Sequence, residues 1–228
     1  MSPVKTPVVL SWSGGKDSSL ALERLLADPG IQVVSLCTTV SAEHDRVSIH
    51  GIRRSILRRQ ATMLQLPLVE VPLGPMPSNS SYEAAFAAGL AQVRTSHPTV
   101  STIAFGDLFL EDVRAYREAL LGRLGWTGLY PLWREPTRPL AEYFISRGYR
   151  AVLTCVDTTQ LDASFAGRTF DSQLLSDLPP AVDPCGERGE FHTCVYAGPV
   201  FHQPIAVRTG EQVLREERFQ FCDLLEDL

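Results

Sequence analysis

Six consecutive residues near the start of the chain have the types and the spacing for phosphate chemistry. They combine two hydroxyls, two glycines, a cation and a carboxylate: Ser13, Gly14, Gly15, Lys16, Asp17 and Ser18. Residues 8–12 before them have the composition of a buried parallel strand, and leucines at helical spacing follow within residues 20–26. A glycine-rich turn from a strand into a helix presents backbone amides to an anion, so the sequence predicts a phosphate-binding turn.

Each residue of this turn has an expected role beside a phosphate. The two glycines are expected to adopt positive φ and to leave room for the ligand, so Gly15→Val should abolish ligand binding and leave the fold largely intact. Ser13 and Ser18 offer hydroxyl donors, and Lys16 offers a cation. Asp17 would repel a phosphate, so we expect it to hold a Mg²⁺ ion that contacts the phosphate, or to cap the helix. An ordinary glycine-rich helix start is the structural alternative.

A second polar cluster lies within residues 183–193, where glycines, carboxylates and a histidine follow one another closely. If residues 190–195 form a strand, Glu190, His192 and Cys194 face the same side of it. An acid would then lie beside an imidazole, and such a pair suits proton transfer. A charged hairpin tip without chemistry is the alternative.

The cysteines indicate neither a disulfide framework nor a clear metal site. Five cysteines are an odd number, and they are spread widely along the chain. Four side chains could still be interpreted as zinc ligands: Cys185, His192, Cys194 and His202. Their spacing lacks the close pairs typical of structural zinc sites, so this interpretation is the weaker one.

Two shorter motifs are expected to lie near the phosphate-binding turn. His50 precedes a helical pattern that begins at Ile52, and Gly106 and Asp107 follow an apolar strand at residues 100–105. In an open parallel sheet, ligands bind beyond the carboxyl ends of the strands, so these residues could form further walls of one site. A locally satisfied histidine and a simple turn at the end of a strand are the alternatives.

The elements needed to position these residues alternate between strand and helix. Apolar runs predict parallel strands, separated by helical patterns, at residues 8–12, 31–40, 68–73 and 100–105. A charged helix is predicted at residues 111–124, and the composition changes soon afterwards. A shorter helix at residues 139–147 and a strand at 151–156 then predict a smaller C-terminal α+β subdomain, with the division placed between residues 128 and 129.

The composition narrows the class of protein. The chain of 228 residues has a net charge of −5, which argues against a nucleic-acid partner because phosphate backbones require clustered Lys and Arg. No apolar stretch is long enough to cross a membrane, and no signal peptide precedes the first strand, so a cytoplasmic protein is expected.

The turn resembles a known phosphate-binding motif. Neither a Walker-type nor a dinucleotide-binding glycine motif follows the first strand. The string Ser-Gly-Gly-x-Asp-Ser instead resembles the PP-loop of the ATP pyrophosphatase superfamily, whose members cleave ATP between the α- and β-phosphates. Over nearly its whole length the chain resembles the diphthine–ammonia ligase family within that superfamily. The resemblance rests on residues 11–18, 50–51, 106–107, 131–133 and 186–193.

This resemblance implies a fold and an activity. It implies a Rossmann-like open parallel sheet with helices on both faces at residues 1–128, which binds ATP, and a substrate-binding subdomain at residues 129–228. The enzyme would adenylate a carboxylate acceptor, release pyrophosphate and form an amide with ammonia. Implied contacts to ATP and Mg²⁺ are Ser11, Ser13, Gly14, Gly15, Lys16, Asp17, Ser18, His50, Gly106 and Asp107, with Asp17 at the metal. Implied catalytic residues are Asp17, Glu187, Glu190 and His192.

The chain departs from the family pattern in its C-terminal motif. Members that amidate diphthine typically have the sequence Gly-Glu-Gly-Gly-Glu-Tyr-Glu-Thr in this motif. This chain has Arg188, Phe191 and His192 at the third, sixth and seventh positions. The variant is similar to a bacterial branch, which implies another carboxylate acceptor, with a corrinoid side chain as one suggestion. The identity of the acceptor, the ammonia source and a homodimeric state are left open.

Two other functions are carried as alternatives. A sulfur-inserting, tRNA-modifying enzyme of the same superfamily could use Cys155 or Cys185 to carry sulfur, although the acidic charge and the lack of paired cysteines argue against it. A module that binds adenine nucleotides without turnover would bind ATP and release no pyrophosphate.

Overall fold

The structure, a computed structural model, describes residues 5–227 and contains two sheets. Within these residues the first sheet has six strands, in the order β3-β2-β1-β5-β6, with β4 also paired to β2. All pairs are parallel except β2 with β3. The strands are β1 (Thr6–Ser11), β2 (Ile31–Ser41), β3 (Arg46–Val47), β4 (Leu68–Leu73), β5 (Thr102–Ala104) and β6 (Thr127–Leu129).

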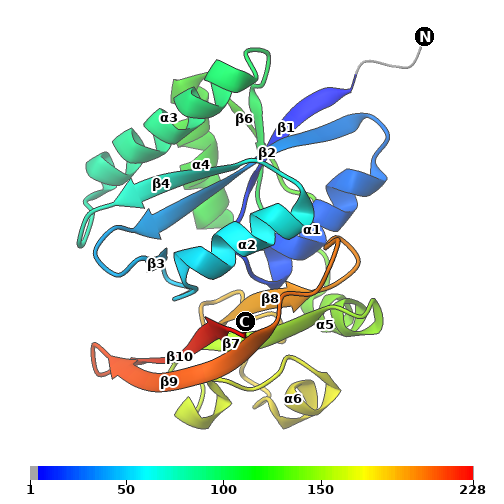
Figure 1. The fold of residues 1–228 in the computed structure, drawn as a ribbon, viewed down its shortest axis with the longest axis vertical. Coiled ribbons are helices and arrows are strands. Elements are labelled where there is room, and N and C mark those ends of the chain that lie inside the picture. The colour runs from blue at the N-terminus through cyan, green and yellow to red at the C-terminus, as the bar shows by residue number, and fades with distance from the viewer. Residues whose placement is uncertain (1–4, 228) are drawn as a thin grey trace.

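Helices cover both faces of this sheet (Figure 1). They are α1 (Lys16–Ala27), α2 (Arg54–Leu64), α3 (Asn79–Ser96) and α4 (Glu111–Leu124). Along β1, Val8 and Leu10 belong to the hydrophobic cluster under α1 and α2, whereas Val9 belongs to the cluster under α3 and α4. This alternation follows from the two-residue period of a strand. The predicted α/β class, with a Rossmann-like open sheet and helices on both faces, is confirmed.

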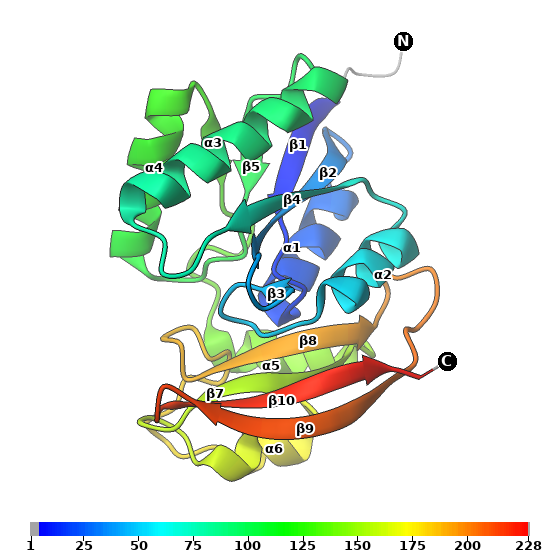
Figure 2. The same cartoon turned by 60° about the vertical axis from the view of Figure 1, so that its left-hand side comes forward.

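The second sheet is antiparallel, with the order β8-β7-β10-β9. Its elements are α5 (Thr137–Ser146), β7 (Arg150–Asp157), the short 3₁₀ helix η1 (Ala163–Phe165), α6 (Ser172–Asp177), β8 (Phe191–Ala197), β9 (Val207–Arg215) and β10 (Phe219–Glu226). In Figure 2 this sheet lies below the first, and β8 is the strand nearest to it. A smaller C-terminal α+β part is therefore present.

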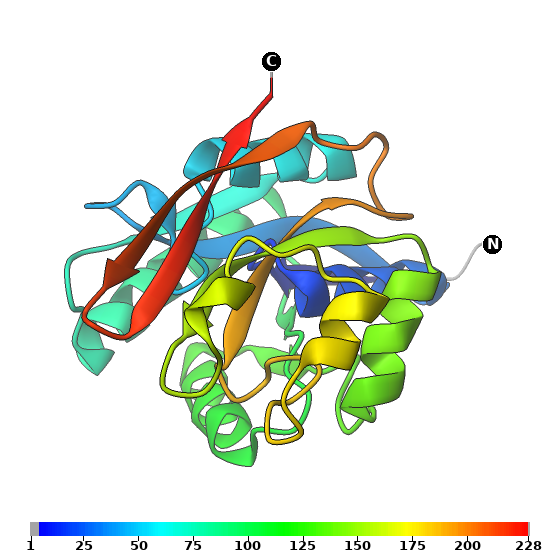
Figure 3. The same ribbon diagram turned by 90° about the horizontal axis from the view of Figure 1, so that it is seen from below.

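The two sheets share one hydrophobic core. The cluster under α1 includes Leu22 and Leu25 and continues to Phe144 of α5 and to Leu153 and Val195 of the second sheet. Figure 3, seen from below, shows β8 and β7 crossing α1. Burial of this common apolar surface holds the two parts of the chain together.

Several predicted boundaries differ from those observed. Helix α4 and strand β4 have the predicted bounds, but β5 is limited to Thr102–Ala104, and a strand that was not predicted, β3, follows β2. The division predicted between residues 128 and 129 stays a prediction. Strand β6 crosses it, because Leu129 still pairs with Ala104 of β5.

The described residues give two further findings on the class of protein. All five cysteines are buried free thiols. In the part of the chain that the structure describes, no helix has both the length and the apolar character needed to cross a membrane.

Candidate nucleotide-binding and active site

The glycine-rich turn after β1 contains one positive φ angle. Gly14 has φ of +80°, a conformation that favours glycine. Gly15 has φ of −95° and ψ of −178°, and this extended residue is the N-cap of α1. The prediction that both glycines adopt positive φ is therefore wrong for Gly15. Extended backbone is the ordinary conformation of an N-cap residue.

Hydroxyl groups fix the backbone of this turn. The carbonyl of Gly15 accepts hydrogen bonds from the Ser18 and Ser19 hydroxyls, both at 2.9 Å. The Gly15 amide donates to Ser13 Oγ at 3.2 Å, and the Ser13 and Ser18 hydroxyls lie 3.3 Å apart. The serines predicted as phosphate donors thus also stabilise the turn that would hold the phosphate.

The edge strand of the second sheet binds directly to the turn. The backbone amide of Lys16 donates to Thr193 Oγ1 at 3.0 Å, and the amide of Val195 donates to the Gly14 carbonyl at 2.9 Å. A Cβ atom on Gly15 would lie 3.0 Å from the Thr193 carbonyl oxygen and 3.2 Å from Cε1 of His50. The space beside Gly15 is therefore filled by protein, so Gly15→Val would displace β8 as well as any ligand. The expectation that this variant keeps its fold is corrected accordingly.

Gln60 of α2 connects the turn to both sheets, and sequence reasoning missed it. Its Oε1 accepts from Trp12 Nε1 at 3.0 Å, and its Nε2 donates to the Gly14 carbonyl at 3.0 Å and to the Val195 carbonyl at 2.7 Å. The side chain is fully buried. The available signal was a polar residue four positions after Ile56, on the apolar face of a helix.

Lys16 lies beneath the turn with its side chain only 1% exposed. Its ammonium group pairs with the Asp17 carboxylate and lies 5.8 Å from the centre of the Phe170 ring. Burial lowers the pKa of Lys16, but the negative potentials of Asp17, Cys185 and Glu187 exceed this effect and raise the pKa above its usual value. Lys16 is therefore a permanent cation beside the turn.

Gly106 and Asp107 lie against the first turn of α1, as the strand-end argument predicts. A Cβ atom on Gly106 would be 2.8 Å from the carbonyl carbon of Asp17, so only glycine allows this approach. Asp107 Oδ2 is paired with Arg117 Nε of α4 at 2.9 Å. Burial raises the pKa of Asp107 and the Asp17 charge adds to this, although Arg117 opposes both effects.

Glu187 reaches the same place from the C-terminal half. Its Oε1 accepts a hydrogen bond from the backbone amide of Leu108 at 2.7 Å, in the loop that follows β5. Burial, followed by the charges of Asp17 and Asp107, raises the pKa of Glu187 to about 7. A carboxyl group with this pKa can accept or donate a proton near neutral pH.

Glu190 has a different environment from the one predicted. It is 2% exposed, and its two oxygens accept hydrogen bonds from the amides of Asp183 and Arg188, both at 2.9 Å. Asp183 in turn accepts from the Cys185 amide at 2.8 Å, which closes the loop before β8. No hydrogen bond joins Glu190 to His192 among residues 5–227. The expected acid–imidazole pair is absent because the Glu190 carboxylate is occupied by backbone amides.

His192 instead packs against His50. The two ring centroids are 4.5 Å apart, with an angle of 43° between the rings. Burial lowers the pKa of His50 to about 4, and burial together with the charge of His50 lowers that of His192 well below its usual value. Both imidazoles are therefore neutral near pH 7. Within residues 5–227, the buried Nδ1 of His50 has no hydrogen-bond partner, so it is available to a ligand.

A cavity of about 730 Å³ opens at the carboxyl ends of β1, β2 and β4. Its wall includes Ser11 and Ser13 beside the turn, His50, Thr39 of β2 and Arg117 of α4. The volume lies in the range of small-molecule sites, and the position is the one where open α/β sheets bind ligands. An apolar and polar lining of this kind can hold a nucleotide base and ribose, with the phosphates directed toward the turn.

The four zinc candidates are not gathered. Cys194 Sγ accepts from Gln60, Cys185 Sγ donates to the Thr137 carbonyl, and His202 is exposed. Across residues 5–227 no three His, Cys, Asp or Glu side chains are grouped as metal ligands. Asp17, which is 30% exposed, could still hold a Mg²⁺ ion, because Mg²⁺ commonly uses one carboxylate together with substrate phosphates.

Most of the predicted site residues therefore lie together, although their roles stay predictions. The phosphate-binding turn, His50, Gly106, Asp107, Glu187 and His192 all lie around the start of α1. Glu190 lies behind them, in the loop that holds Glu187. Arg117 was not predicted, and a single arginine on a helix gave no signal in the sequence.

Comparison with known proteins assigns the family. The N-terminal domain model of diphthamide synthase matches residues 5–127, and the C-terminal domain model matches residues 136–224. The chain belongs to the diphthamide synthase family. Two of the three residues that depart from the expected C-terminal motif have defined contacts: Arg188 lies 5.7 Å from the Phe109 ring, and His192 packs on His50.

Two curated relatives in the diphthamide synthase family are named diphthine–ammonia ligase. The protein of Schizosaccharomyces pombe is 25% identical over 229 residues, which cover 93% of this chain and 38% of that protein. The protein of Bos taurus is 26% identical over 221 residues, which cover 88% of this chain and 82% of that one. The chain thus spans less than half the length of the yeast relative.

A solved structure, the FMN adenylyltransferase of Candida glabrata, is also similar. The superposition covers 64% of this chain and 52% of the adenylyltransferase chain, with 14% sequence identity and a TM-score of 0.39. A similarity of this size supports no conclusion about the site of this diphthamide synthase family member.

Proposed function

We propose that the protein is an ATP-dependent carboxylate–ammonia ligase. The observation that carries the proposal is the attachment of the C-terminal motif to the phosphate-binding turn, through Thr193 on Lys16 and Glu187 on the loop after β5. This arrangement gathers a phosphate site, a cation and a titratable carboxyl group around the start of α1. The diphthine–ammonia ligase names of the relatives support the same reaction class.

The proposed reaction has two steps, adenylation of the carboxylate and displacement of AMP by ammonia. A carboxylate oxygen of the acceptor attacks the α-phosphorus of ATP, and the bond from that phosphorus to the bridging oxygen breaks, releasing pyrophosphate. Ammonia then attacks the carbonyl carbon of the adenylate, AMP leaves, and a base takes one proton from nitrogen. Amide, AMP and pyrophosphate are the products.

Residues of this chain have separate roles in the proposal. Lys16 and the amides at the start of α1 stabilise negative charge on the phosphates. Asp17 would hold Mg²⁺, which neutralises phosphate charge when bound. His50 offers a neutral ring with an unpaired Nδ1 to the nucleotide. Glu187 suits the role of general base better than Glu190 does, because its pKa of about 7 allows proton transfer near neutral pH.

A sulfur-inserting enzyme is less compatible with these contacts. The thiols of Cys155 and Cys185 are buried, and burial raises the pKa of each to about 12. A sulfur carrier needs an accessible thiol with a lowered pKa, since the thiolate is the nucleophile.

The test measures pyrophosphate release and amide formation with a panel of carboxylates that includes diphthine and corrinoid acids. We expect ATP binding in all samples, and pyrophosphate release with ammonia that depends on one class of acceptor. ATP binding without release for any acceptor would instead support a nucleotide-binding module without turnover. The homodimeric state stays a prediction, which sedimentation of the same sample tests.

A further inference from the structure

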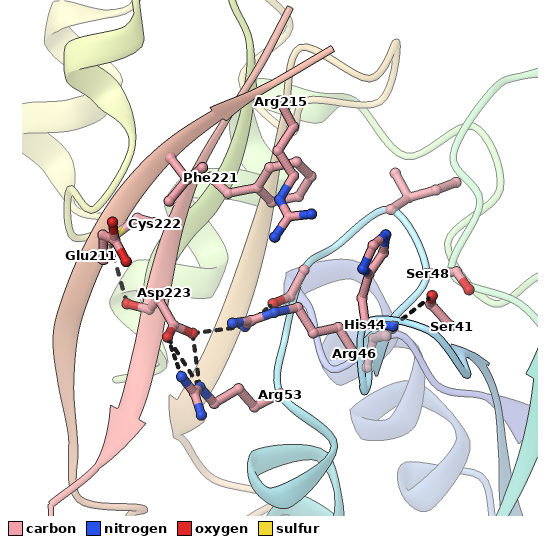
Figure 4. A pocket seen from close by; sticks show the side chains of 14 residues that line it. Ser41, His44, Arg46, Ser48, Arg53, Glu211, Arg215, Phe221, Cys222 and Asp223 are labelled. Atoms are coloured by element: carbon pink, nitrogen blue, oxygen red, sulfur yellow. Dashed lines mark hydrogen bonds and ion pairs between the residues drawn. The ribbon is translucent and has the colours of Figure 1, made fainter. Parts of the chain in front are cut away.

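A second cavity lies beside the nucleotide cavity, between the segment 41–53 and the hairpin formed by β9 and β10. Its volume is about 250 Å³. Figure 4 shows the side chains that line it. Neither the phosphate-binding turn nor the C-terminal motif at residues 183–193 lines it. Its lining is therefore not explained by the proposed binding of ATP.

One end of this second cavity holds two arginines around one aspartate. Arg46 Nη1 lies 2.7 Å from Asp223 Oδ1, and Arg53 Nη2 lies 2.5 Å from Asp223 Oδ2. Burial alone would raise the pKa of Asp223, but the hydrogen bonds from Arg53 and Arg46 lower it to about 2. Asp223 is therefore ionised, and two guanidinium groups surround its single charge.

The other end carries a cation without a counter-charge. Among residues 5–227 no carboxylate lies within ion-pair distance of Arg215, and Figure 4 shows its side chain directed from the hairpin toward Arg46, beside Phe221. The lining contains three arginines and two carboxylates, Glu211 and Asp223, in a chain with a net charge of −5. The second cavity is thus locally positive in an acidic protein, which favours an anionic ligand.

The two cavities lie on either side of one wall, and the backbone of this wall is strained at Ile49. Five residues line both cavities: Ser41, His44, Val47, Ser48 and Ile49. Ile49 has φ of +67°, a strained conformation for a β-branched residue, and its side chain is 70% exposed. Glu216, which follows Arg215, lines the nucleotide cavity. A ligand in the second cavity would therefore lie next to a bound nucleotide.

We propose that the second cavity is the recognition subsite for the acceptor, and that Arg215 binds an anionic group of the acceptor other than the carboxylate that reacts. The apolar part of the acceptor packs on Phe221 and Ile49, and the reacting carboxylate extends past Ile49 to the nucleotide. The acceptor class is a molecule or side chain with an apolar body and at least two acidic groups. This inference rests on the proposed ligase function.

The test uses direct binding of a simple probe to the full-length protein in the presence of a non-hydrolysable ATP analogue. Ligand-observed NMR compares hexanoate with hexanamide, which has the same apolar chain without the charge. We expect hexanoate to bind about tenfold more tightly than hexanamide, and Arg215→Ala to weaken hexanoate binding about tenfold, as for loss of a charge-assisted contact. Arg215→Lys should retain part of the affinity.

Arg208→Ala is the matched control, because Arg208 is an exposed arginine on the same strand and lines neither cavity. It should leave hexanoate binding within about twofold of wild type, and neither variant should change affinity for the ATP analogue. Absence of hexanoate binding to the wild type, equal binding of hexanamide, or unchanged binding by Arg215→Ala would each overturn the inference. These results do not depend on turnover, so amide formation without Arg215-dependent binding would leave the proposed function intact.

Discussion

Glu187 and Glu190 belong to one short motif but lie in opposite environments. Glu190 accepts backbone amides with both oxygens, so its carboxylate holds the loop at residues 183–190. Glu187 accepts the Leu108 amide with one oxygen and shares its surroundings with the charges of Asp17 and Asp107. The loop that Glu190 stabilises therefore positions Glu187.

The two glutamates should respond differently to the same substitution. Glu187→Gln removes a base and should lower amide formation by roughly 10²–10⁴, with ATP affinity retained. The rate of the wild type should rise through pH 7 as Glu187 loses its proton, and this rise should be absent in the variant. Steady-state rates between pH 5.5 and 8.5 measure both effects.

Glu190→Gln is the comparison variant. Its amide group would direct N–H toward a backbone N–H that now donates to Glu190, which should lower the free energy of unfolding by roughly 1–3 kcal/mol. Urea denaturation measures this change. If Glu190→Gln instead abolishes the rate at full stability, Glu190 is the base, as the sequence motif first suggested.

At the scale of elements, the edge strand β8 is the part of the second sheet that completes the site. On its outer edge the amide and the carbonyl of Val195 would otherwise be unpaired, and they bind the Gly14 carbonyl of the turn and Gln60 of α2. The strand therefore closes the phosphate-binding turn from below. A helix, a turn and a strand that are distant in sequence form one buried polar network.

This network predicts a large cost for removing one side chain. Gln60→Ala leaves Trp12 Nε1 and the Val195 carbonyl without a partner and removes one of the two donors to the Gly14 carbonyl, so it should lower the free energy of unfolding by roughly 3 kcal/mol. Gln92→Ala, on the exposed face of α3, should change it by less than about 0.5 kcal/mol. Equal stability of the two variants in urea would show that Gln60 does not connect these elements.

At the scale of the whole molecule, the site is an interface between two halves of one core. His50 comes from the segment after β2 and His192 from β8, and their neutral rings meet where the two sheets are joined. Lys16 adds a positive charge nearby, which disfavours protonation of both. The stability of the contact between the two sheets should therefore depend on pH.

The direction of this dependence follows from the lowered pKa values. The unfolded chain takes up protons on both histidines near pH 6.5, whereas folded His50 does so only near pH 4. The stabilising contribution of His50 is complete above pH 6.5 and is lost as the pH falls toward 4, by roughly 1–2 kcal/mol at pH 5. His192, whose pKa is also lowered, changes the stability in the same direction. Urea denaturation at several pH values measures the slope.

A double variant isolates the two histidines from other titrating groups. With both residues replaced, His50→Gln and His192→Gln, the stability should fall less steeply between pH 6.5 and 5 than in the wild type. His97→Gln is the control, because His97 at the end of α3 stacks on no other aromatic ring within residues 5–227. A slope unchanged by the double variant would contradict the lowered pKa values.

Local patterns in the amino-acid sequence were enough to predict the class of fold and the phosphate-binding turn. Periodicity along strands and helices reports which faces are buried, and this local signal gave β4 and α4 with their observed bounds. The string of residues 13–18 is local too, because one turn contains all of its groups. The resemblance to the ligase family, which rests on such short motifs, is consistent with the family matches.

How the C-terminal motif contacts the phosphate-binding turn depends on the three-dimensional fold. The role of Glu190 depends on the fold of its own loop, and the importance of Gln60 depends on partners in β1, the turn and β8. The conformation of Gly15 likewise depends on the N-cap that it forms. Hydrogen bonds between distant segments and the burial that shifts pKa values are set by three-dimensional packing, so no local pattern in the sequence records them.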